Sequence, residues 1–189
     1  MLMGMSLPTL LEPFSFEIGT MKRPQLMESL RNVGVQLNDS AIILLDNPTF
    51  DSPEPETVTV VEHSLIELGL EDGAVLSRIF QIAREGDLDL CPPSAAPYLR
   101  LALRNQGTAP DTVMSDGHTP SGSLTVASPP LQSEASFPKG FYLRVVDGQN
   151  WLRGYRCDDE YEWGPHDRFV FRADRSLTAS ISAPHSRHS

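Results

Sequence analysis

The chain has 189 residues, of which 40% are hydrophobic, and it carries a formal net charge of −10. This length and hydrophobic content suffice for one substantial core, in one domain or two small halves. Two cysteines are too few for a disulfide scaffold, and no run approaches the ~20 apolar residues that a membrane-spanning helix needs.

The beginning of the chain is mildly apolar, but it lacks the cationic region and the cleavage site of a signal peptide. The sequence therefore predicts a cytoplasmic location. The acidic excess is confined to residues 1–138, which hold 7 Lys and Arg against 18 Asp and Glu, whereas residues 139–172 hold 6 of each. Because an acidic surface repels phosphate backbones, this distribution argues against nucleic acid as a partner.

The first predicted elements follow from alternation and capping. Residues 14–18 alternate apolar with polar side chains, which predicts a half-buried strand. A helix follows between Pro24, which suits a first helical position, and Gly34, which suits a left-handed C-cap. Asn38 is the predicted N-cap of a second helix at residues 39–46.

The next segments continue this mixture of strands and helices. Residues 57–63 are dense in β-branched side chains and predict a strand, whereas residues 74–85 carry apolar side chains at helical spacing and end at a glycine. Residues 98–105 alternate leucines with polar or small side chains, which predicts a strand with one face exposed to solvent. In such a strand Arg100 and Arg104 point the same way.

The remainder of the chain is predicted to be β-structure between two irregular segments. Residues 106–121 are rich in Gly, Ser, Thr and Pro and indicate a flexible loop or linker, and residues 173–189 are predicted to be disordered. Residues 122–172 predict an antiparallel meander with these parts: strands at 123–127, 141–146, 151–157 and 168–172, and a hairpin turn at Asp147-Gly148. The predicted fold class is α+β, with a mixed N-terminal region at 14–105 followed by this C-terminal meander.

Two sets of segments resemble a group of uncharacterised bacterial proteins. The first set is LDLCPP at 88–93 followed by PYLRL at 97–101. The second set is PKGFYLR at 138–144, continued by WLRGY at 151–155 and DRFVF at 167–171. The resemblance spans roughly residues 20–172 and implies a bacterial origin, but it implies no activity, ligand or catalytic residue.

Cys91 is the first candidate site residue. A thiol just before Pro92 can lie at a turn where backbone N–H groups lower its pKa, with His63 as its base. The competing interpretation is a core position, because Cys91 follows Leu88 and Leu90 and cysteine is among the most buried residue types.

The second candidate site is the aromatic and basic side of residues 151–157, where alternate side chains project together. The complete predicted set of binding residues is Trp151, Arg153, Tyr155, Arg100, Arg104, Tyr161 and Trp163. Aromatic rings alternating with arginines on a sheet are typical of a stacking platform for bases or of a protein-binding surface. The competing interpretation is that the rings pack in the core as cross-strand pairs. The acidic run at 158–160 cancels the field of the arginines and favours a protein partner over nucleic acid.

The sequence lacks the familiar signatures of metal sites and enzymes. The acidic run at 158–160 and the histidines His63, His118 and His166 have no recognised ligand spacing, so neither a metal site nor a cofactor is predicted. A Gly-rich phosphate loop, a G-x-S-x-G elbow, an H-E-x-x-H helix and a C-x-x-C pair are all absent.

These observations favour one class of function and leave a second open. The first is a non-catalytic protein-interaction or accessory module of a bacterial cytoplasm, which presents the side of Trp151 and Arg153 to a partner. The alternative is a small thiol-dependent enzyme or hydrolase centred on Cys91, with His63 or His166 as its base. A membrane partner is not predicted.

Overall fold

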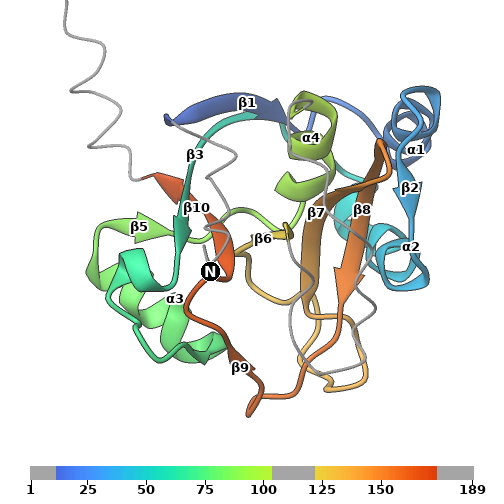
Figure 1. Ribbon diagram of the computed structural model, residues 1–189. Helices are drawn as coiled ribbons and strands as arrows, with labels where there is room; N and C mark the ends of the chain where they lie inside the picture. Colours follow the sequence, from blue (N-terminus) through green and yellow to red (C-terminus); the bar gives the residue numbers. More distant parts are fainter. Residues whose placement is uncertain (1–11, 104–121, 174–189) are drawn as a thin grey trace, which may run out of the picture.

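The computed structural model describes residues 12–103 and 122–173 (Figure 1). Within these ranges the helices are α1 (Arg23–Asn32), α2 (Asp39–Leu45), α3 (Leu76–Glu85) and α4 (Ala95–Ala102), and the short 3₁₀ turns are Pro48–Phe50 and Ile66–Leu68. The strands are β1 (Phe14–Ile18), β2 (Gln36–Leu37), β3 (Glu56–Ser64), β4 (Ala74–Val75), β5 (Leu88–Asp89), β6 (Leu124–Val126), β7 (Gly140–Val146), β8 (Gln149–Tyr155), β9 (Glu162–Trp163) and β10 (Arg168–Ala173). The predicted α+β class is confirmed.

Strands from both halves of the chain form one large sheet. Its eight strands run in the order β1-β3-β10-β6-β7-β8-β2, with β5 paired to β10 beside this path, and β4 and β9 form a separate pair. The antiparallel pairings of β6 with β7 and of β7 with β8 match the predicted meander. The prediction of a purely antiparallel meander is nevertheless wrong, because β6 is parallel to β10 and β2 is parallel to β8. Strand β10 inserts between β3 and β6, and its long-range pairing with β3 is not encoded in local alternation.

The predicted strand at residues 98–105 is wrong in its described part, because residues 98–102 belong to α4. The side chains of Ala95, Leu99 and Leu103 recur every four residues, and all three are buried in one core. Pro97 lies in the first turn, where its missing N–H breaks no intrahelical hydrogen bond. The leucine alternation is therefore incidental, since Leu101 is only partly buried whereas the helical row is fully covered.

The helices divide the apolar side chains into two cores on opposite faces of the sheet. The first core lies under α1, α2 and α4 and includes Leu30, Leu44 and Leu99. The second lies under α3 and includes Phe80 and Phe169. Figure 1 shows α3 apart from the other three helices. Because both faces are covered, the central strand β7 is buried along its whole length.

Helix ends follow the predicted caps with one exception. The side chain of Asn38 caps α2 by accepting a hydrogen bond from the N–H of Ala41 at 2.9 Å, and Gly34 after α1 has the left-handed φ of 76°. After α3 the expected glycine, Gly86, has an ordinary φ of −97°. The left-handed residue is Asp87, with φ 63°.

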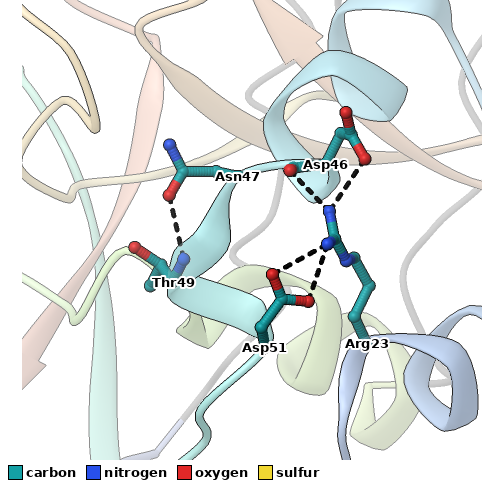
Figure 2. Close-up of polar contacts among 5 residues, drawn as sticks. All are labelled: Arg23, Asp46, Asn47, Thr49 and Asp51. Atoms are coloured by element: carbon teal, nitrogen blue, oxygen red, sulfur yellow. Dashed lines mark hydrogen bonds and ion pairs between the residues drawn. The ribbon is translucent and has the colours of Figure 1, made fainter.

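Arg23 ties the beginning of α1 to the end of α2 (Figure 2). Its Nη1 donates to the carbonyl of Asp46 and, at 2.8 Å, to Oδ1 of the same residue, and its Nη2 donates to Oδ2 of Asp51 at 2.8 Å. A cation at this position also complements the negative end of the α2 dipole. Asn47 accepts from the N–H of Thr49 at 3.0 Å and shapes the turn that follows. These contacts hold α2 in place behind β8.

Several predictions fall outside the described residues. These are the linker at 106–121, the tail beyond residue 173, and the side chain of Arg104. Of the helices in the described ranges, none combines the length and apolarity that crossing a lipid bilayer requires.

Candidate functional site

Strand β8 presents its two faces to different surroundings. Leu152 is fully buried in the first core, and Gly154 lies directly against the beginning of α2, which leaves no room for a side chain. Trp151, Arg153 and Tyr155 therefore project from the opposite face. The structure thus brings three of the predicted binding residues to one side of one strand.

Trp151 and Arg153 form a stacked pair at the surface of this face. The guanidinium carbon of Arg153 lies 4.1 Å from the centre of the Trp151 ring, and both side chains are partly exposed. This separation is well within the range of a cation–π interaction. On the neighbouring strand β7, Arg144 is paired with Trp151 and Tyr142 is paired with Arg153. We call these four residues, Tyr142, Arg144, Trp151 and Arg153, the aromatic–arginine face; Tyr142 and Arg144 are buried, so of the four it is Trp151 and Arg153 that reach solvent.

The other predicted rings form a buried layer next to this face. Tyr155 and Trp163 are 7% and 4% exposed, so they belong to the second core and are not presented to solvent. Trp163 meets three rings edge to face, with centroid distances of 5.4 Å to Tyr155, 5.3 Å to Tyr161 and 5.0 Å to Phe169. Burial raises the pKa of the Tyr155 hydroxyl, with a further contribution from Cys157, so the ring stays neutral. Tyr161 is partly exposed at the edge of the cluster.

Arg100 does not join the aromatic–arginine face. It lies on α4 across the sheet, is 2% exposed, and donates through Nη2 to the carbonyl of Leu103. Burial lowers the pKa of its guanidinium to about 10, so the side chain still carries its charge at neutral pH. Its role in α4 is to hold the end of the helix.

Cys91 lies inside the first core. It is 1% exposed, its N–H donates to the carbonyl of Ala127 at 2.7 Å, and its thiol lies 3.8 Å from the carbonyl of Val170. Burial raises the pKa of the thiol to about 12, although the charge of Arg172 opposes this shift. The thiolate that a nucleophile needs is therefore scarce at neutral pH. His63 is partly buried on β3, opposite Phe169 of β10.

The two cysteines should react differently with an alkylating reagent. In the folded protein we expect iodoacetamide to modify Cys157, which is only half-buried, and to leave Cys91 unmodified at neutral pH. Mass spectrometry of the digested protein measures both sites, and the same reaction in guanidinium chloride is the control in which both are modified. Rapid labelling of Cys91 in the folded state would contradict the burial of its thiol and restore the thiol-enzyme hypothesis.

Acidic side chains border the site on the loop after β8. Asp158, Asp159 and Glu160 are exposed, and the carboxylate of Asp159 lies 3.8 Å from the ammonium of the largely buried Lys139. In the described ranges no group of three or more His, Cys, Asp or Glu side chains is arranged to hold a metal ion. These carboxylates therefore add negative charge beyond the Tyr155 end of β8.

Sequence reasoning missed the buried Arg144 and the close approach at Gly154. Arg144 is the one charged residue in the otherwise apolar run GFYLRVV, and its side chain is fully buried. A strand buried on both faces reads as a continuous apolar run, so a single charge in it was the available signal. Gly154 carried a weaker signal, since a glycine inside a strand often marks a close approach of another backbone.

Comparisons with family models, curated proteins and solved structures found no match to this chain.

Proposed function

We propose that the chain is a non-catalytic protein-interaction module of a bacterial cytoplasm, and that the aromatic–arginine face binds a carboxylate-bearing segment of a protein partner. The observation that carries the proposal is the stacked pair of Trp151 and Arg153, which is partly exposed on a strand whose other face packs against α2. Tryptophan and arginine dominate the binding energy of many protein interfaces. A guanidinium also matches a carboxylate in shape and charge.

The charge around the stacked pair supports a protein over a nucleic acid. Arg153 supplies positive charge on the exposed part of the face, while Asp158, Asp159 and Glu160 supply negative charge on the loop that follows β8. Nearby positive and negative charges partly cancel each other's field. Such a surface therefore attracts a phosphate backbone less than a surface of basic side chains alone would. A protein segment with charges of both signs can satisfy the two regions together.

Replacing either member of the stacked pair should weaken partner capture without unfolding the protein. We expect Trp151→Ala and Arg153→Ala each to weaken capture of a protein from cells of the source organism by about thirtyfold, which corresponds to ~2 kcal/mol for an interface hot spot. The matched control is Arg156→Ala. Arg156 is an exposed arginine one residue beyond β8, and it turns the other way, toward Ser40 at the beginning of α2. Quantitative mass spectrometry of the captured proteins measures the effect.

Two further measurements complete the test of partner capture. Circular dichroism of each variant checks that the fold is kept, which we expect because neither side chain is fully buried. Captured material that disappears after nuclease treatment would show that nucleic acid is the ligand and would overturn the proposal. Equal capture by the Trp151→Ala, Arg153→Ala and Arg156→Ala variants would overturn it as well.

A further inference from the structure

A polar cavity lies at the end of α3, away from the aromatic–arginine face. Its volume is about 540 Å³, and its charged lining consists of Glu56, Arg84, Asp87, Asp89 and Arg172. This volume is within the range of ~300–1,000 Å³ that is usual for small-molecule sites. The residues come from the beginning of β3, the end of α3, the turn into β5 and the end of β10.

Two of the five charges neutralise each other. Arg172 donates through Nη2 to Oε1 of Glu56, so this pair contributes little net field to the cavity. The remaining charges are the guanidinium of Arg84 and the carboxylates of Asp87 and Asp89, all three on exposed residues. The cavity therefore offers one cationic group and two anionic groups to a ligand.

The backbone of Asp87 gives a second reason to examine this cavity. Asp87 has a φ of 63° directly after the C-cap of α3, a conformation that glycine adopts without steric cost. The other non-glycine residue with positive φ in the described ranges is Asp147, which stands in the tight turn between β7 and β8. Asp87, one of the residues that line the cavity, thus stands where a glycine would fit the backbone better.

We propose that this cavity binds a small organic zwitterion, whose ammonium group lies between Asp87 and Asp89 and whose acid group pairs with Arg84. An anion alone would face two carboxylates, and an amine alone would leave the guanidinium without a counterpart. A bare metal ion suits the cavity less well, because no three metal-ligating side chains in the described ranges are grouped to hold one. A ligand with both charges matches the lining at each point.

The test compares three probes of similar length on the full chain. The probe 6-aminohexanoate carries both charges, whereas hexylamine and hexanoate each carry one. We expect saturable binding of 6-aminohexanoate with a millimolar dissociation constant, and binding of each single-charge probe about tenfold weaker or absent. Chemical-shift changes of backbone amides in two-dimensional NMR spectra measure the affinity and should centre on Leu88, Asp89 and Ala173, which line the cavity.

Two variants separate loss of the site from loss of the fold. Asp87→Gly removes the carboxylate and relieves the left-handed backbone, so we expect about tenfold weaker binding of 6-aminohexanoate together with an unchanged or higher melting temperature. Asp72→Asn, at an exposed carboxylate outside the cavity, should leave binding unchanged. Absence of saturable binding by 6-aminohexanoate, equal binding of hexylamine, or unaltered affinity in Asp87→Gly would each overturn the proposal.

Discussion

Replacing Gly154 with alanine is expected to lower the free energy of unfolding by about 3 kcal/mol. A Cβ atom at this position would lie 2.6 Å from the carbonyl carbon of Ser40 and 2.8 Å from the nitrogen of Ala41. Both are backbone atoms in the first turn of α2, so the clash is relieved only if the helix moves away from β8. Such a movement opens a gap in the first core beneath the helix.

The same movement would break a set of hydrogen bonds centred on Asn38. Its Oδ1 accepts from the N–H of Gly154 at 2.8 Å and from the N–H of Ala41 at 2.9 Å, and its Nδ2 donates to the carbonyl of Gly154 at 3.0 Å. One side chain therefore caps α2 and fastens it to β8. Each of these bonds contributes roughly 1 kcal/mol when intact and leaves a partly buried backbone group unsatisfied when broken.

Gly86→Ala is the matched control for this prediction. Its new Cβ would approach the carbonyl oxygen of Ile82 at 3.4 Å, an ordinary contact, and its φ of −97° suits any residue. We expect its stability to stay the same or to rise by less than about 1 kcal/mol. Chemical denaturation of both variants measures the difference. Equal unfolding free energies for Gly154→Ala and Gly86→Ala would show that α2 does not lie against β8 as described.

Replacing Glu62 with leucine is expected to destabilise the protein by about 3 kcal/mol or more. The Glu62 side chain is fully buried, and its Oε1 accepts from Nε of Arg168 at 2.5 Å, where the arginine side chain is 11% exposed. Removing the Glu62 carboxylate leaves the guanidinium of Arg168 in a poorly hydrated environment without this partner. Glu67, whose Oε2 lies 3.3 Å from Nη2 of Arg168, can compensate only in part because its side chain is 47% exposed.

The double variant Glu62→Leu with Arg168→Met distinguishes the ion pair from simple packing. Replacing both members of a buried pair with apolar side chains is often neutral, so we expect the double variant to recover most of the lost stability. A double-mutant cycle from urea denaturation gives the coupling energy. If the double variant lost as much stability as the two single variants together, the pair would not act as a unit, and this account would be contradicted.

The stacked pair is the part of the candidate site that the sequence predicted. Strict alternation places Trp151 and Arg153 on one face of a strand, and this needs only the period of two side chains in β-structure. Whether a ring on that face is presented to solvent or covered depends on what packs above it. Trp151 is partly exposed, whereas Tyr155 is covered by Trp163 from a strand that follows the next loop.

The sequence by itself determined the elements whose signals are local. Asn38 as a cap, Gly34 as a left-handed residue and the Asp147-Gly148 turn each depend on dihedral preferences or on hydrogen bonds within a few residues. The tertiary structure alone decided the helix at Ala95–Ala102 and the parallel pairing of β6 with β10. These features depend on contacts between residues far apart in the chain, whose energies are set by which surfaces meet and not by the pattern of any one segment.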